Sequence, residues 1–256
     1  MAIAEPPVLE VSGVTFGYDR EAVLVDVNLR IDRHDFLAVI GPNGGGKTTL
    51  LRVVLGLEQP WQGQVRWNLP GRRRAGRIGY VPQFSTFDRN FPLSLRDAVI
   101  MGRVGRLGLF GRYRADDHKA VDAILERLRL SHLAGVPIAD VSGGQLQRAL
   151  IGRALVADPD ILLLDEPTSS VDAETRLTLS ELLSDLNRRI PIVVVTHDVT
   201  GFATQVRQIA CVNRRLYYHS GGQLSHDQLE EAYGCPVELI AHGVPHRVLA
   251  EHPEGG

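Results

Sequence analysis

The stretch Phe36-Leu-Ala-Val-Ile40-Gly41-Pro42-Asn43-Gly44-Gly45-Gly46-Lys47-Thr48 decides the fold. Its first five residues form a short, continuous apolar run, which is typical of a strand buried in a parallel sheet. Its last eight residues match the pattern G-x-x-x-x-G-K-[ST] of a phosphate-binding loop. Residues 47–55 are expected to form a helix that ends near Gly56. A strand, a glycine-rich loop and a helix in this order predict a nucleotide site.

The residue types of this loop explain how it would hold phosphate. Glycines let the backbone curl until several N–H groups point inward, and the helix N-terminus adds its positive end. Lys47 supplies a charge to the β- and γ-phosphates, and the Thr48 hydroxyl can ligate Mg²⁺. A glycine-rich turn with a chance lysine is the alternative, and the strand and helix around the loop argue against it. We therefore expect a nucleotide to be bound by Gly41, Pro42, Asn43, Gly44, Gly45, Gly46, Lys47, Thr48 and Thr49, with Thr48 also a ligand of Mg²⁺.

Composition limits the classes of function. The chain has 256 residues and a net charge of −2, so no global positive field calls for nucleic acid, and none is expected as a partner. Its two cysteines argue against a disulfide framework and fit a reducing compartment. No apolar run approaches the length of a membrane span, and the first residues do not form a signal peptide. We expect a cytoplasmic protein that touches a membrane only through a partner.

Strand and helix patterns alternate along the rest of the chain. Residues 8–16 and 23–31 are expected to pair as antiparallel strands across a turn at residues 17–20. Further short apolar runs predict buried strands, and helical spacing predicts three more helices, the second with Ser142 as its N-cap. The expected fold class is α/β, a parallel sheet flanked by helices. The strands are expected at residues 78–81, 161–164 and 192–195, and the helices at residues 116–130, 143–157 and 173–188.

Two carboxylates follow one of these apolar runs. Asp165 and Glu166 stand where a buried strand ends, and carboxylates are least expected there unless they serve a site. Asp165 would hold Mg²⁺, and Glu166 would polarise the attacking water as a general base. A solvent-facing acidic pair is the alternative, and it would be favoured if the phosphate loop were absent.

Several short motifs stand in a fixed order. The phosphate loop is followed by Gln83, by Ser142-Gly143-Gly144-Gln145, by Asp165-Glu166, by Ser170-Val171-Asp172 and by His197. Over nearly the whole chain, this order resembles the nucleotide-binding subunit of an ATP-binding cassette transporter. The resemblance implies a P-loop NTPase (RecA-like) core, an N-terminal antiparallel β subdomain and an inserted α-helical subdomain at about residues 85–158. The ATPase domain would span residues 1–232, and residues 233–256 would form a tail that either regulates the chain or stabilises a dimer.

The resemblance also implies a role for each motif. Tyr18 matches the aromatic platform for adenine, Gln83 the glutamine that senses nucleotide and helps to bind Mg²⁺, and Asp172 the loop that communicates between sites. Glu166, His197 and Lys47 form the implied catalytic set, and Thr48, Gln83 and Asp165 the implied Mg²⁺ set. The alternatives that involve no nucleotide are that Tyr18 caps a hairpin, Gln83 is a solvated amide and His197 makes a structural hydrogen bond. Two departures are Val141, where leucine is usual, and Ser170-Val171 in place of the commoner Ala-Leu.

In this family a short signature segment, which corresponds to residues 142–145 here, closes over the nucleotide that another subunit holds. The residues Ser142, Gly143, Gly144 and Gln145 are therefore implied to act in trans, and the chain is expected to pair with a second copy of itself as a homodimer. Integral membrane permease subunits would be its other partners, and the chain would lie peripherally at the cytoplasmic face of the cell membrane. Residues 84–110, with Phe84, Phe87 and Phe91, are where the permease is expected to dock.

A second resemblance concerns what is transported. Residues 91–97, 101–103, 108–110 and 213–216 are similar to the branch that imports zinc, manganese or iron with an extracytoplasmic metal-binding protein, an indirect partner here. The alternatives are an importer or exporter of another substrate and a soluble cassette ATPase. A phosphate-loop kinase or GTPase is a third, but it would not explain the signature.

Histidines gather in the tail. His242 and His246, with His226, Cys235 or His252, could form a zinc site. Gly243 and Pro245 disfavour a single helical face, so ordinary surface histidines are the preferred interpretation.

Overall fold

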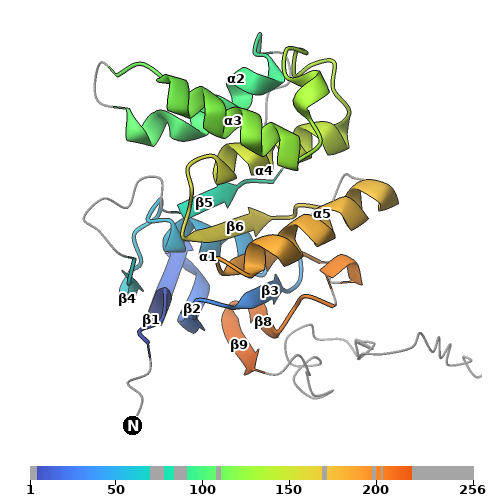
Figure 1. The fold of residues 1–256 in the computed structure, drawn as a ribbon. Helices are drawn as coiled ribbons and strands as arrows, with labels where there is room; N and C mark the ends of the chain where they lie inside the picture. The colour runs from blue at the N-terminus through green and yellow to red at the C-terminus, as the bar shows by residue number, and fades with distance from the viewer. Residues whose placement is uncertain are drawn as a thin grey trace, which may run out of the picture.

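The computed structural model describes residues 5–69, 78–83, 91–107, 111–168, 172–197, 200–202 and 204–220. These residues form a small antiparallel sheet, a larger sheet and a layer of helices (Figure 1). The predicted tail and its histidines from residue 226 onward lie outside the described residues, as do Phe84, Phe87, Ser170 and Val171.

The small sheet has the order β2-β1-β4, with β1 at Leu9–Tyr18, β2 at Glu21–Ile31 and β4 at Gln62–Trp67. The expected antiparallel pairing of the first two strands is confirmed. The expected turn at residues 17–20 is too long, because Gly17 and Tyr18 still pair with β2. Only Asp19 and Arg20 make the turn, and both have a positive φ. No sequence pattern indicated β4.

The larger sheet has the order β5-β6-β7-β3-β8-β9. Its first five strands are parallel, and β9 joins β8 antiparallel at the edge. The expected α/β class with a parallel sheet is confirmed, whereas β8 and β9 were not foreseen. The bounds are β3 Phe36–Ile40, β5 Ile78–Val81, β6 Ile161–Asp165, β7 Ile192–Val195, β8 Gln208–Asn213 and β9 Arg215–Ser220.

The helices divide into two groups. Figure 1 shows α2, α3 and α4 together beyond the β5 edge of the large sheet, while α1 and α5 lie beside the sheet itself. The bounds are α1 Lys47–Val54, α2 Leu95–Ile100, α3 Ala115–Arg127, α4 Gly143–Leu155 and α5 Ala173–Asn187. The described residues also include the 3-10 turns η2 Met101–Arg106, η3 Ser131–Leu133 and η4 Thr200–Phe202.

At β6, the two faces of the large sheet belong to two separate hydrophobic cores. In β6, Ile161 and Leu163 pack with α1 and the small sheet, whereas Leu162 and Leu164 pack with α2, α3, α4 and α5. This alternation follows from the two-residue period of a strand. Since both faces are covered, β6 is apolar at four successive positions and fully buried.

Candidate nucleotide-binding site

Part of the sequence-predicted site, namely the phosphate loop, Asp165, Glu166 and His197, meets at one edge of the large sheet. Parallel strands end at the same edge, and the pairing of Val39 and Asp165 with Val195 aligns the ends of β3, β6 and β7. The phosphate loop follows β3, Glu166 follows β6 and His197 lies two residues beyond β7. The parallel topology therefore brings together residues that are far apart in the sequence.

The phosphate loop rests on β8. A Cβ atom at Gly41 would lie 2.0 Å from the carbonyl oxygen of Val212, so only glycine allows this approach. Arg214 donates its backbone N–H to the Gly45 carbonyl at 3.1 Å. Gly46 has a φ of 102°, a conformation that side chains disfavour. The loop thus takes its shape from the β8–β9 hairpin, a support that no motif in the sequence indicated.

Lys47 is buried at the start of α1. Its ammonium donates to the carbonyl oxygens of Gly41 at 2.8 Å and Pro42 at 3.0 Å. Burial lowers the pKa of Lys47, and the carboxylates of Glu166 and Asp165 partly offset this effect. Without nucleotide, the lysine therefore binds its own loop, and phosphate oxygens could replace those carbonyls.

Thr48 and Asp165 form the part of the site that suits a cation. The Thr48 hydroxyl donates to Asp165 Oδ2 at 3.1 Å. Asp165 is 2% exposed, and its other carboxylate oxygen has no hydrogen-bond partner. Burial raises the pKa of Asp165, since the charged form loses its water. A hard cation would satisfy the orphaned oxygen, so Thr48 and Asp165 could hold Mg²⁺. Among the described residues, no group of three or more histidine, cysteine or acidic side chains could hold a metal.

Glu166 and His197 contact each other. The His197 Nδ1 atom lies 2.8 Å from Glu166 Oε2, and the Glu166 side chain is mostly buried while His197 is largely exposed. Glu166 has a φ of 50°, which is rare for a residue with a side chain. Its N–H donates to the Val195 carbonyl at 2.8 Å and holds this conformation. The strained backbone thus fixes a carboxylate beside an exposed imidazole.

Tyr18 and Gln83 lie at the surface. Tyr18 is 44% exposed, with its ring edge-on to Phe16 at 5.1 Å between centroids. Its outer face could stack on a base. Gln83 follows β5 by two residues and is exposed. Both roles stay predictions.

The signature residues open α4. The Ser142 side chain accepts from Gln145 N–H at 3.2 Å, and the Gln145 side chain accepts from Ser142 N–H at 2.8 Å, so the expected N-cap is a complete capping box. A Cβ atom at Gly144 would lie 2.5 Å from Thr175 Oγ1 of α5. The signature therefore packs against α5, whereas the phosphate loop packs against β8.

Asp172 caps α5 at the same place. Its carboxylate accepts from Thr175 N–H at 2.7 Å. Thr175 thus touches both the signature helix and the predicted inter-site loop. It belongs to no motif, and only the fold reveals it.

Comparison with known proteins gives the family. A family model described as ABC transporter matches residues 24–169. A "Probable metal transport system ATP-binding protein" of Chlamydia muridarum is 37% identical, over 81% of this chain and 89% of the relative. The zinc uptake system ATP-binding protein ZurA of Listeria innocua is 36% identical, over 82% of this chain and 84% of the relative. The manganese transport system ATP-binding protein MntB of Bacillus subtilis is 37% identical, over 74% of this chain and 76% of the relative.

Comparison with solved structures gives the same family. A metal-chelate type ABC transporter in an inward-facing conformation, so described, has a TM-score of 0.81 at 30% identity, covering 91% of this chain and 90% of that one. A dimeric ATP-binding cassette with ADP and Pi bound has a TM-score of 0.70 at 26% identity, covering 83% and 98%.

The chain belongs to the ABC transporter family and is one of its ATP-hydrolysing subunits. Cassettes of this family form dimers and work within transporter complexes. Within the described residues, no helix is both long and apolar enough to cross a bilayer.

Proposed function

We propose that this chain energises an importer for a divalent metal ion, zinc, manganese or iron. The observation that carries this proposal is that relatives 36–37% identical to the chain are named for metal, zinc and manganese transport. The chain would lie at the cytoplasmic face of the cell membrane, bound to integral permease subunits, and an extracytoplasmic metal-binding protein would deliver the ion to the permease.

ATP binding is the first step of the proposed mechanism. Lys47 would exchange its contacts with the Gly41 and Pro42 carbonyls for oxygens of the β- and γ-phosphates. Thr48, Asp165 and Gln83 would hold Mg²⁺. When bound, Mg²⁺ would neutralise charge on the β- and γ-phosphates.

Hydrolysis is assigned to the Glu166–His197 pair. The Glu166 carboxylate would accept a proton from the attacking water, and His197, 2.8 Å away, would hold that carboxylate in place while its exposed ring reaches the γ-phosphate. The fixed backbone of Glu166 supports this role, because a base must be positioned before it can act.

Dimer closure would complete the site. Ser142 is exposed at the N-terminus of α4, where its hydroxyl and the backbone N–H groups of Gly143 and Gly144 could meet the γ-phosphate bound by a second copy. Loss of that phosphate would open the homodimer. Asp172, which contacts Thr175, would link the two sites.

Permease docking is assigned to the helical layer. Phe91, Met101 and Val104 are 57%, 46% and 52% exposed; Phe91 precedes α2, and η2 carries the other two. Exposed apolar side chains in one region suit a protein interface. The rest of the predicted docking segment, residues 84–90 and 108–110, lies outside the described residues.

Purification of the chain from membranes with its partners, followed by uptake assays, tests the proposal. We expect ATP-driven uptake of zinc, manganese or iron by vesicles that contain the complex, and no uptake with Lys47→Met. Uptake of a sugar or peptide instead would contradict the metal assignment and leave the ATPase assignment intact.

A further inference from the structure

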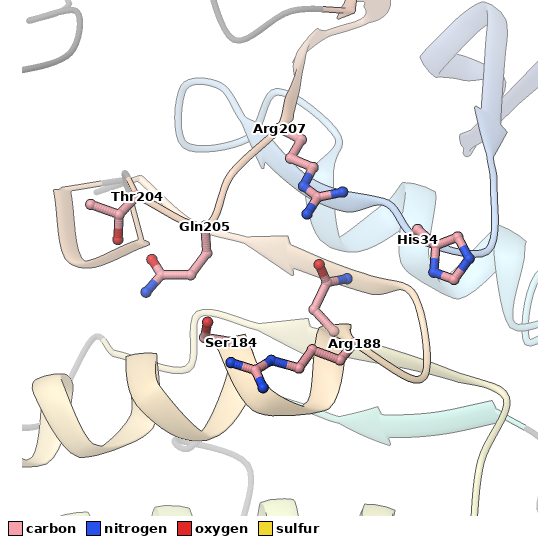
Figure 2. A pocket seen from close by; sticks show the side chains of 7 residues that line it. His34, Ser184, Arg188, Thr204, Gln205 and Arg207 are labelled. Atoms are coloured by element: carbon pink, nitrogen blue, oxygen red, sulfur yellow. The ribbon is translucent and has the colours of Figure 1, made fainter.

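A pocket of about 420 Å³ lies at the edge of the large sheet opposite the nucleotide site. Figure 2 shows that its labelled residues come from three places: the turn before β3, the end of α5, and the segment between η4 and β8. Strands β3, β7 and β8 begin beside it. Its lining residues are His34, Ser184, Asn187, Arg188, Thr204, Gln205 and Arg207.

The pocket carries positive charge that no acidic side chain of the described residues pairs. Other arginines at the surface form ion pairs with acidic side chains, for example Arg30 with Asp32 and Arg52 with Glu58. In contrast, the Arg188 and Arg207 side chains form no ion pair with any described residue, and no described acidic side chain lines the pocket.

The Asp35 carboxylate interacts electrostatically with Arg207 from outside the pocket lining. It accepts the N–H of Asp32 at 2.7 Å and forms no ion pair with either arginine of the pocket. Two exposed guanidinium groups therefore remain at the pocket. Guanidinium forks match the oxygens of phosphate and carboxylate groups.

His34 and four polar side chains without a formal charge complete the lining. The Asn187 amide is fixed, because it donates to the Asp35 carbonyl at 2.9 Å. The Gln205 amide donates to Ser180 Oγ at 2.8 Å, while its oxygen is buried and has no hydrogen-bond partner. An unsatisfied buried acceptor costs free energy unless a donor reaches it. With the Ser184 and Thr204 hydroxyls, Gln205 suits a ligand that bears hydroxyl groups.

We propose that this pocket binds a small phosphate monoester with hydroxyl groups. Arg188 and Arg207 bind its phosphate, and Gln205, Ser184 and Thr204 bind its hydroxyls. The volume of about 420 Å³ falls in the range of small-molecule sites and exceeds what a bare ion needs. The site is separate from the nucleotide site, since it lies at the amino ends of strands whose carboxyl ends carry the phosphate loop and His197.

The test uses the full chain saturated with Mg²⁺ and ADP, so that the phosphate loop is occupied. Ribose 5-phosphate is titrated by calorimetry and by thermal unfolding, with inorganic phosphate as a second probe. We expect one ribose 5-phosphate per chain, and a rise in Tm of about 2–4 °C at about five times its Kd. Inorganic phosphate should bind more weakly.

Variants locate the binding. Arg188→Gln and Arg207→Gln should each weaken ribose 5-phosphate binding at least about tenfold, since each removes hydrogen bonds to a charged group. Arg189→Gln, an exposed neighbour outside the lining, should bind as the unaltered chain does. Absence of saturable binding, or unchanged binding in both lining variants, would overturn the proposal. Equal affinity for inorganic phosphate would overturn the choice of a monoester.

Discussion

Glu166 and His197 reach each other from the ends of different strands, and this contact makes a prediction at the scale of single residues. Glu166→Gln keeps the shape of the side chain but removes its capacity to accept a proton. We expect ATP turnover to fall roughly 10²- to 10⁴-fold, with ATP binding intact, as measured by phosphate release and by equilibrium nucleotide binding. Full turnover in this variant would remove Glu166 from the role of base.

Asp165 makes a second prediction, because burial raises its pKa above the ordinary value of 3.8. The folded protein therefore binds this proton more tightly than the unfolded chain does. The resulting stabilisation is complete below pH 3.8 and is lost as the pH rises through the raised pKa. At neutral pH the ionised, partly unsatisfied carboxylate destabilises the nucleotide-free chain.

Asp165→Asn removes that charge. We expect its Tm, relative to the unaltered chain without nucleotide, to increase as the pH rises from 4.5 to 8, while Mg²⁺-dependent hydrolysis is lost. Thermal unfolding across this pH range measures the first effect. A Tm difference that stays constant with pH would contradict the assigned cause.

At the scale of elements, the sequence predicts best where the pattern is local. β3 and β7 match their predicted ranges because each is a continuous apolar run between clear breaks. β4 escaped prediction because its sequence carries few apolar residues, and its strand depends on cross-strand pairs such as Val11 with Val65. Such pairs form only between strands that are distant in the sequence, so no local pattern indicates them.

The residues of the candidate site also fall into two groups: those that a local motif predicts, and those that only the folded chain brings into place. Lys47, Asp165 and Glu166 could be predicted from motifs, since a strand end and a glycine-rich loop are local features. Val212 and Thr175 could not, because their roles arise from the approach of Gly41 and Gly144 in the folded chain.

The capping box of α4 gives a prediction at this scale, with a matched control on α2. Ser142 and Ser94 both cap their helices by the same pair of hydrogen bonds. Ser142→Ala and Ser94→Ala should each cost about 1 kcal/mol and lower Tm by about 2–4 °C. Only Ser142→Ala should also abolish hydrolysis, since only Ser142 is assigned to the nucleotide. Equal hydrolysis in the two variants would reduce Ser142 to a helix cap.

At the scale of the whole molecule, the phosphate loop and the signature segment adjoin different hydrophobic cores. Leu50 and Leu51 behind the phosphate loop pack in one core, and Val141 and Leu146 beside the signature pack in the other, across the large sheet. The sheet therefore holds the motifs apart within one chain. A second chain can bring its signature to the loop without disturbing either core, which favours an isologous dimer with two composite sites.

Mixing two defective subunits tests this arrangement. Lys47→Met removes the phosphate-binding charge and Ser142→Ala the signature hydroxyl, so each homodimer has two broken sites. In a mixed dimer, one site combines an intact loop with an intact signature, and the other carries both defects. An equal mixture contains about half mixed dimers, so turnover should recover to about a quarter of the unaltered value if the sites act independently. Each variant alone should stay inactive, and a mixture no more active than its components would contradict sharing of the site between chains.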